Sequence, residues 1–370
     1  MIYPKGYKFR LYPNAAQRNF INQTLGCCRF VYNYFLTVRK EAYQKDKTKI
    51  TYTKTSSLMT VLKQDIEHLW LNAADSIALQ QSLRDLDTAY QNFFKGQSGY
   101  PKYKSKHNHK QTYRTISKSI KIEGKYLNLP KIGLIKFEQS REILGKIVNA
   151  TITRSASGKY FVSLCVEEDL ADNLKLNKGG KIGIDVGLKE FYTDNLGNTV
   201  ANPKFLKKLT KKLRKEQRKL SRKIVGSKNR EKQRIKVAIV HERIANARLD
   251  FLHKQTTLLC RENQTIAVES LKVKNLMKNH KLARAISDVS WNEFFRQLAY
   301  KAVLYGSDLI KVPTFYPSSQ TCNHCGYKNL LAKDLSVRNW DCPKCGSHLD
   351  RDENAAKNIL AKALEIKSNA

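Results

Sequence analysis

The sequence of 370 residues contains no apolar run near membrane-spanning length, so we expect neither a transmembrane helix nor a membrane partner. No apolar stretch follows the basic side chains of its first eight residues, which predicts no secretory signal and a cytoplasmic protein. Acidic residues are scarce, with 32 Asp and Glu against 68 Lys and Arg and a formal charge of +36. This imbalance argues against an enzyme that handles small molecules and predicts a polyanionic partner.

Aromatic residues are interleaved with the bases, with 18 Tyr and 14 Phe in the chain. Nucleic acid is favoured over a membrane surface, because bases stack on aromatic rings whereas lipid headgroups bind an amphipathic helix. The length and the 41% content of hydrophobic residues suffice for two or three domains with a substantial core. The sequence shows no internal repeat, and low-complexity sequence is confined to one Lys/Arg-rich segment.

The first half of the chain alternates between strand-like and helix-like periodicity. Residues 7–12 alternate apolar and basic side chains, and Asn14 can cap the helical pattern that runs from residue 15 to about 94. A Gly-containing segment breaks this pattern, and a basic linker follows over residues 102–110. From about 113 to 168 the period is two, which predicts a small antiparallel β-domain. We expect the opening strand to join this domain, which makes the helical lobe an insertion.

The second half begins, after a polar linker, with a strand over residues 181–187. Asp185 shares one face of this strand with Gly183 and Gly187, and we expect the two glycines to leave an open floor around the acid. A hairpin, two long helices, a buried-type strand, an amphipathic helix over residues 289–305 and a closing strand follow. The apolar stripes of the two long helices predict an antiparallel pair.

The helix pair carries the strongest charge bias of the chain. Residues 204–236 contain sixteen Lys and Arg against two Glu. A solvated face usually mixes charges of both signs, so the imbalance favours contact with phosphates over simple solvation. The candidate contacts are Lys207, Lys208, Lys211 and Lys212.

Four cysteines near the C-terminus have the spacing of a zinc site. Cys322 and Cys325 form one C-x2-C pair, and sixteen residues later Cys342 and Cys345 form another. A glycine follows each pair and can adopt a positive φ, which turns backbone amides toward the sulfurs. We expect one structural Zn²⁺ held by four thiolates; the alternative is two disulfides of a secreted protein. The remaining cysteines are expected to be small buried hydrophobes in a reducing compartment; they are Cys27, Cys28, Cys165 and Cys260.

Three acids are candidates for a magnesium site. Asp185 lies in the first strand of the second half, Glu269 ends a later strand, and Asp352 lies in the first turn of the last predicted helix. Hydrolysis of a phosphodiester is helped by two divalent metals, and Mg²⁺ prefers carboxylate ligands. Each acid alone also fits a structural aspartate, the start of a solvated loop, or an ordinary acid at a helix N-terminus. Asp350 is a doubtful neighbour that can cap the helix instead.

Taken together with the cysteines, these acids and several other stretches give the chain a resemblance to the transposon-encoded TnpB family of RNA-guided DNA endonucleases, which are related to type V CRISPR effectors. The resemblance spans nearly all of the chain and is carried by RLYP at 10–13, CRFVYN at 28–33, LRDL at 83–86, AYQNFF at 89–94, GIDVG at 183–187, DFLHK at 250–254, PSSQTC at 317–322 and DRDENAA at 350–356. By resemblance, Asp185, Glu269 and Asp352 occupy the three acid positions of a RuvC nuclease.

The resemblance also implies an architecture, an α/β and α+β multidomain fold. A β-barrel wedge domain would comprise residues 1–12 and 110–175, interrupted by a helical recognition lobe over 13–109. An RNase H-like RuvC nuclease domain would comprise residues 176–317 and 349–370, interrupted by a zinc ribbon over 318–348. The implied partners are a guide RNA from the transposon end and target double-stranded DNA that is recognised beside a short motif, and the implied location is the prokaryotic nucleoid.

The helical lobe is expected to supply the duplex contacts. Gln80 and Gln81 suit adenine edges, and Tyr52 and Lys54 fall in what reads as a polar loop, although all four fit ordinary surface residues equally well. Two rival functions stay open at this point. One is a nuclease-inactive nucleic-acid-binding regulator, and the other is an RNA-independent DNA strand-transfer transposase.

Overall fold

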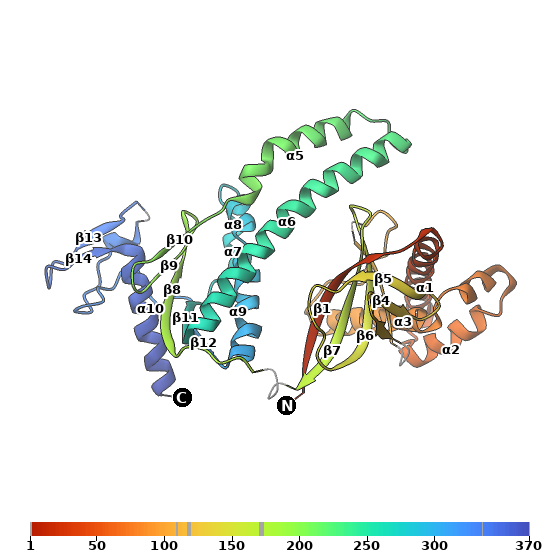
Figure 1. Cartoon of the computed structure of the whole chain (residues 1–370), viewed down its shortest axis with the longest axis horizontal. Coiled ribbons are helices and arrows are strands. Elements are labelled where there is room, and N and C mark those ends of the chain that lie inside the picture. The colour runs from red at the N-terminus through yellow and green to blue at the C-terminus, as the bar shows by residue number, and fades with distance from the viewer. Residues whose placement is uncertain (1, 109, 117–119, 170–173, 335, 370) are drawn as a thin grey trace. The chain divides into compact units, whose positions relative to one another are not determined.

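The computed structural model describes residues 2–108, 110–116, 120–169, 174–334 and 336–369. The chain forms two compact units, Met1–Leu170 and Ala171–Ala370, which are described separately (Figure 1). Within the described residues, no helix is long and apolar enough to cross a membrane.

The first unit is built on a seven-stranded antiparallel sheet with the order β2-β6-β7-β1-β5-β4-β3. Its strands are β1 (Ile2–Tyr12), β2 (Lys110–Thr115), β3 (Lys121–Glu123), β4 (Tyr126–Leu129), β5 (Gly133–Glu138), β6 (Lys146–Ser155) and β7 (Tyr160–Asp169). β1 pairs with β7 and with β5, which confirms that the opening strand joins the later β-domain. Among the described residues no pairing joins β2 to β3, so the observed pairings do not close the sheet into the expected barrel.

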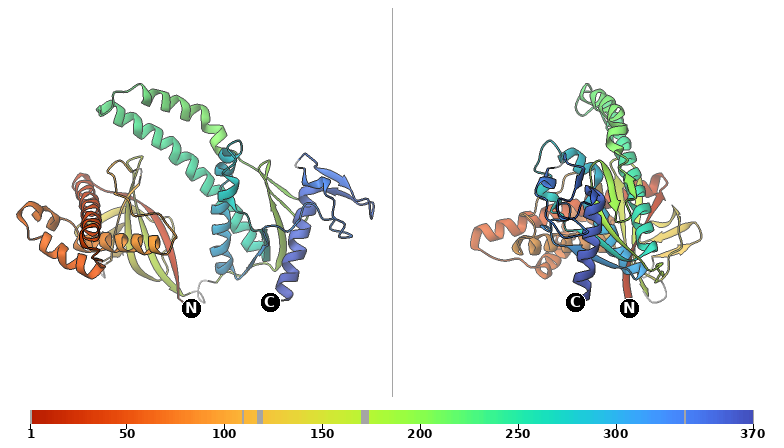
Figure 2. Two further views of the ribbon diagram at one scale, coloured as in Figure 1. Left: turned by 180° about the vertical axis from the view of Figure 1, so that it is seen from behind. Right: turned by 90° about the vertical axis from the view of Figure 1, so that its left-hand side faces the viewer.

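Helices are inserted between β1 and β2, as the periodicity predicted. They are α1 (Ala15–Asp46), α2 (Tyr52–Leu62), the 3-10 helix η1 (Ile66–Ala73) and α3 (Ser76–Phe94). Asn14 caps α1 as expected, and its side chain and that of Gln17 bond each other's backbone amides. Phe35 of α1 and Leu83 of α3 share one buried core with Phe9 of β1, so the helices are part of the same hydrophobic unit as the sheet. The helices of this unit lie beside its sheet (Figure 2).

The second unit is built on a five-stranded mixed sheet with the strand order β10-β9-β8-β11-β12. Its strands are β8 (Gly180–Val186), β9 (Glu190–Asp194), β10 (Thr199–Ala201), β11 (Asn263–Glu269) and β12 (Asp308–Val312). The three strands β8, β11 and β12 run parallel to one another. Helices α6 (Lys228–Glu262) and α9 (Trp291–Tyr305) cover one face of this sheet, and α10 (Arg351–Ser368) covers the other (Figure 1).

The basic helix pair of the second unit consists of α5 (Phe205–Ser221) and α6. Leu213 of α5 packs against Val237, Val240 and Ile244 of α6, which confirms the predicted antiparallel pairing. Both helices extend well beyond the sheet of this unit (Figure 1, Figure 2). A long, thin hairpin of this kind exposes most of its surface, and that surface carries the excess positive charge.

The helix expected over residues 289–305 is confirmed as α9, which begins two residues later than expected. Ser290 has a φ of 59°, in the left-handed region, and separates α8 (Ala283–Val289) from α9. A serine gives no signal of such a break, since helices usually end at glycine. The remaining elements of this unit are α7 (Val273–Leu276), the 3-10 helix η2 (Leu331–Lys333), β13 (Asn339–Asp341) and β14 (His348–Asp350).

Candidate functional site

The three predicted acids meet at one edge of the second unit's sheet. The parallel register places Ile184 of β8 opposite Val268 of β11, so the next residues, Asp185 and Glu269, follow side by side at the carboxyl ends of these strands. Both lie on the face that α10 covers, because Ala267 packs against that helix and side chains alternate along a strand. Asp352 enters the same site from the first turn of α10.

The pKa of Asp185 is affected by the other two acids. Burial raises the pKa of Asp185 well above its ordinary value, and the negative charges of Glu269 and Asp352 raise it further. Arg351 and Arg338 oppose the shift. Burial also raises the pKa of Glu269, although a hydrogen bond from Ser318 lowers it in part. Carboxylates whose charges repel one another in a partly buried site are suited to hold a divalent cation, which relieves the repulsion.

The floor beside Asp185 is closed, which contradicts the expected open floor. A methyl group added at Gly183 would lie 2.7 Å from Leu360 Cβ and 2.9 Å from Leu360 N, and closer still to the carbonyl oxygen of Ala356. At Gly187, an added methyl group would lie 3.0 Å from the carbonyl oxygen of Glu190. Gly183 is therefore required because the backbone of α10 packs directly on β8.

Two side chains that the sequence reasoning did not single out bind the acids. Ser318 is buried and donates a hydrogen bond of 2.7 Å to Oε1 of Glu269. Arg338 forms an ion pair with Asp352, with Nη1 at 3.2 Å from Oδ2. Asp350 caps α10 by accepting hydrogen bonds from the backbone amides of Asp352 and Glu353. Asp350 therefore has the capping geometry that the sequence offered as its alternative role.

The segment around the cysteines is fixed to α10 by buried polar side chains. Asn358 Nδ2 donates to the carbonyl oxygens of Ser318, at 2.8 Å, and Thr321, at 2.6 Å. Asn354 accepts from the backbone amide of Asn323 and donates to Thr321, and Arg351 donates to the carbonyl oxygen of Asp334. Two asparagines four residues apart in an otherwise apolar helix stripe are the sequence signal that could have identified this contact.

The donor atoms of the three acids do not form as compact a group as those of the four cysteines. Among the described residues, one group of three or more His, Cys, Asp or Glu has donor atoms that all lie within 4.8 Å of one another, and it is the cysteine group. The carboxylates are therefore spread more widely.

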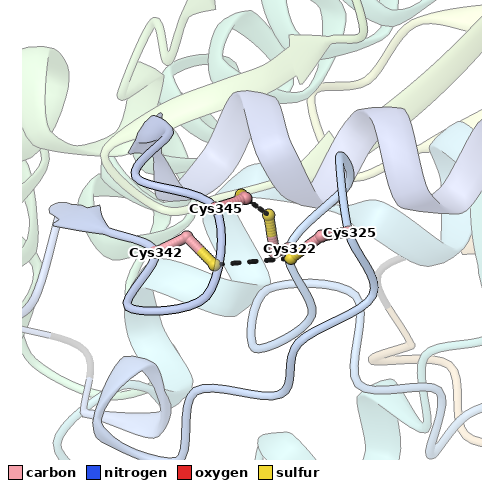
Figure 3. Close-up of side chains that lie close together, drawn as sticks. All are labelled: Cys322, Cys325, Cys342 and Cys345. Atoms are coloured by element: carbon pink, nitrogen blue, oxygen red, sulfur yellow. Dashed lines mark hydrogen bonds between the residues drawn. The ribbon is translucent and has the colours of Figure 1, made fainter.

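The four cysteines point toward one another from two turns (Figure 3). Cys322 Sγ lies 3.7 Å from Cys345 Sγ, and Cys325 Sγ lies 3.5 Å from Cys342 Sγ. These separations exclude disulfides, whose sulfurs are about 2.05 Å apart, and agree with the edge of about 3.8 Å of a tetrahedron with zinc–sulfur bonds of about 2.3 Å.

The turns around the cysteines have the predicted backbone conformation. The glycines that follow the two pairs, Gly326 and Gly346, have φ of 74° and 73°. The four cysteines outside the cluster are free, and three of them, Cys27, Cys28 and Cys260, are buried.

The four residues proposed to contact duplex DNA differ in their exposure to solvent. Tyr52 and Lys54 lie in the first turn of α2 and not in a loop, and the Arg84 guanidinium lies over the Tyr52 ring at 5.1 Å from its centroid. Gln80 is exposed on α3, whereas Gln81 is buried in that helix and has no free edge to offer a base.

The four candidate lysines of α5, Lys207, Lys208, Lys211 and Lys212, are all exposed. The outer face of α5 also carries a groove of about 550 Å³ whose lining residues are all basic. These residues are Lys211, Arg214, Lys215, Arg218, Lys219 and Arg222. They recur at intervals of three and four positions, which aligns them in rows along the helix and suits a phosphate backbone.

Comparison with known families covers most of the chain. A family described as "Probable transposase" matches residues 163–280, and one described as "Cas12f1-like, TNB domain" matches residues 291–359. A third, described as "Helix-turn-helix domain", matches residues 1–48, where this chain forms β1 and the single long helix α1.

Whole-chain relatives are also found. A protein of Streptomyces pristinaespiralis named as an RNA-guided DNA endonuclease is 39% identical over 364 residues, covering 97% of this chain and 89% of that protein. InsQ of Escherichia coli K12, which carries the same description, is 34% identical over 376 residues, covering 96% and 92%. The fold is similar to that of Cas12f1 in its complex with single-guide RNA and target DNA, with a TM-score of 0.51 at 14% identity, covering 97% of this chain and 98% of that one.

Proposed function

Because the chain belongs to the TnpB family of transposon-encoded, RNA-guided DNA endonucleases, we propose that Asp185, Glu269 and Asp352 are the ligands of two Mg²⁺ ions with which it hydrolyses target DNA. The observation that carries the proposal is the meeting of these acids at one sheet edge, where the charges of two of them raise the pKa of the third. All donor atoms are carboxylate oxygens, the ligands that Mg²⁺ prefers.

The residues around the acids orient one carboxylate and balance the charge of another. Bound Mg²⁺ would activate the attacking water and stabilise the leaving oxygen. Ser318 holds one oxygen of Glu269 and so fixes the orientation of the other. Arg338 balances the charge of Asp352 before a cation arrives. Asp185, whose raised pKa favours its protonated form, must release that proton as the cation binds.

Guide RNA and target double-stranded DNA are the partners of the chain. Base pairing with the guide reads the target sequence, while the protein contacts the backbone and a short motif beside the target. The exposed cations of α5 support a backbone contact, because no acidic side chain lines their groove. Tyr52, Lys54 and Gln80 remain candidates for the motif contact; Gln81 is the weakest of the four because it is buried. We place this activity at the nucleoid, in the prokaryotic cytoplasm.

Domain roles follow from the same family. We assign residues 176–317 and 349–370 to an RNase H-like RuvC nuclease domain and residues 318–348 to a zinc ribbon. Residues 1–12 and 110–175 form the wedge domain in this assignment, and residues 13–109 form the recognition lobe. The mixed α/β architecture and the insertion of helices between β1 and β2 support these boundaries.

One structural zinc ion completes the proposed set of metals. Four thiolates fill a tetrahedral site and leave no position for a substrate, so this ion stabilises the fold and takes no part in hydrolysis. The free, closely spaced sulfurs support the assignment. Elemental analysis should find about one zinc ion per chain in the active protein, and Cys342→Ser should remove it.

Cleavage of a plasmid that carries a guide-matched target and its adjacent motif tests the function. Wild-type protein with its guide RNA and Mg²⁺ should cut, whereas Asp185→Ala should not cut and should still bind the guide. Cutting of transposon ends without RNA would favour a strand-transfer transposase. Absence of cutting by the wild type with every guide tried would favour a nuclease-inactive regulator.

A further inference from the structure

A second groove, separate from that of α5, opens beside Glu269. It has a volume of about 400 Å³ and lies between the loop that follows β11, the exposed side of α9 and the end of β12. Glu269 itself contributes to its lining, so a molecule that fills the groove contacts one residue of the acid cluster.

The groove is positively charged. Lys272 and Lys311 both line it and are exposed, and among the described residues neither has an ion-pair partner. Arg296 also lines it and is paired with Glu293 at 2.7 Å. Polar groups of Asn292 and Thr314 contribute to the remainder of the lining. Such a surface attracts a phosphate and offers hydrogen bonds to a sugar or a base.

A solvent-exposed aromatic residue, Phe315, follows Thr314 in the chain. Phe315 is 88% exposed, and the ammonium of Lys272 lies 5.5 Å from the centroid of its ring. An exposed phenylalanine leaves its apolar faces in water, and a flat apolar partner would remove that cost. The ring follows the lining residue Thr314 in the chain and contacts the lining residue Lys272. Phe315 and Lys272 therefore lie together beside the groove, where a single nucleotide can contact both.

We propose that this groove is the subsite for the nucleotide next to the scissile phosphate, with Phe315 stacking on its base and Lys272 and Lys311 contacting its backbone. The inference rests on the proposed function, since it takes Glu269 to be part of the cleavage site. It makes Phe315 a substrate-positioning residue that acts on an unpaired base, because stacking on a side chain requires one face of the base to be free. Stacking recognises any base, so the subsite positions the strand without sequence preference.

Abasic substitution of the DNA, combined with Phe315→Ala, tests the stacking contact. Once the cut position is mapped, one abasic site is placed at each nucleotide flanking it in turn, in guide-matched DNA cut by the full chain with its guide RNA. We expect one position at which the abasic site and Phe315→Ala each reduce kcat/KM about tenfold, and together reduce it no further, since both remove the same contact. Losses that multiply at every position would overturn the proposal.

Matched controls separate this contact from general effects. Leu176 is 87% exposed, and Lys181 is an exposed lysine for which the described residues give no ion pair; both lie near the start of β8, at the opposite edge of the sheet. Leu176→Ala and Lys181→Gln should leave cutting unchanged, whereas Lys272→Gln with Lys311→Gln should raise KM. Phe315→Trp should restore cutting. Groove variants that cut like the two controls would refute the subsite while leaving the endonuclease intact.

The Asp185→Ala variant distinguishes failure of the proposed function from failure of the proposed subsite. If Asp185→Ala kept wild-type cutting, the acid cluster would not be the cleavage site, whatever the groove variants do. A direct readout that does not depend on cutting uses 2-aminopurine at the stacked position, in complexes that carry Asp185→Asn. Its fluorescence should be quenched when Phe315 is present and recover in Phe315→Ala; equal fluorescence in both would overturn the stacking contact.

Discussion

Gly183→Ala should inactivate the enzyme by displacing α10. The added methyl group would lie 2.7 Å from Leu360 Cβ, which is about 1 Å inside the normal carbon–carbon separation of about 3.5–4.0 Å. The other contacts are with backbone atoms of Ala356 and Leu360, which cannot rotate away, so the helix must shift by a similar distance. Asp352, at the start of this helix, shifts with it.

The magnitude follows from this displacement. Catalytic groups must be held within about 0.5 Å of their productive positions, and a misplacement of about 1 Å can reduce the rate about 100-fold. Overpacking of a tight contact also costs about 1–3 kcal/mol in the free energy of unfolding. We therefore expect a loss of about two orders of magnitude in the rate of guide-dependent plasmid cutting, with a moderate fall in Tm.

The assay compares Gly183→Ala with a strand glycine that has room for a methyl group. Gly6 lies in β1 and has no heavy atom within 4 Å of an added Cβ, so Gly6→Ala should cut and melt like the wild type. Guide RNA binding, measured in parallel, should survive in both variants. Wild-type cutting by Gly183→Ala would refute the argument that backbone packing of α10 on β8 sets the acid geometry.

Three further outcomes are expected. Ser318→Ala should raise the Mg²⁺ concentration needed for half-maximal cutting about 10- to 100-fold, as is typical when a metal ligand loses its orienting partner, whereas Ser319→Ala should not. In metal-free protein, burial and the neighbouring acids raise the pKa of Asp185, so its contribution to stability is present at low pH and lost as pH rises through the raised value. The Tm of Asp185→Asn relative to wild type should therefore rise as the pH increases above the ordinary aspartate pKa of about 3.9, and a constant difference would contradict this. Replacing four α5 lysines with Gln should make the log–log salt dependence of duplex binding shallower by up to about 3.6, and an unchanged slope would mean that they only solvate the helix. The four are Lys207, Lys208, Lys211 and Lys212.

The sequence was most informative where the chemistry is local. Four cysteines in two C-x2-C pairs, each followed by a glycine, are enough to predict a metal site, because the ligands of each pair lie within one turn of chain. The alternation along β8 likewise predicted which of its residues share a face. Both patterns depend only on neighbours in the sequence, and the structure brings the four cysteines together and places Ile184 of β8 beside Val268 of β11.

Prediction from the sequence failed where the environment of a residue depends on a partner that is distant in the chain. A glycine beside Asp185 can leave an open space or allow another backbone to pack closely, and the sequence does not distinguish these cases. At Gly183 the position of α10 decides that the space is filled. The burial of Gln81 depends on which face of α3 meets the core, and its immediate neighbours in the sequence do not determine that face. Ser318 and Arg338 carry no local signal of their contacts, because their carboxylate partners come from other elements.

The position of the cysteine segment between β12 and α10 supports the proposed zinc site. The segment is short, and its buried apolar cluster is small: Cys322, Ala332, Trp340, Cys342 and Leu349. A segment with so little core needs a metal to hold one conformation. Its residues Ser318 and Arg338 in turn hold Glu269 and Asp352, and Asn354 and Asn358 of α10 bind its backbone. If the four thiolates hold zinc as proposed, the metal would order a segment that contacts two of the three acids through a hydrogen bond and an ion pair, and the proposed zinc site would be coupled to the carboxylate site.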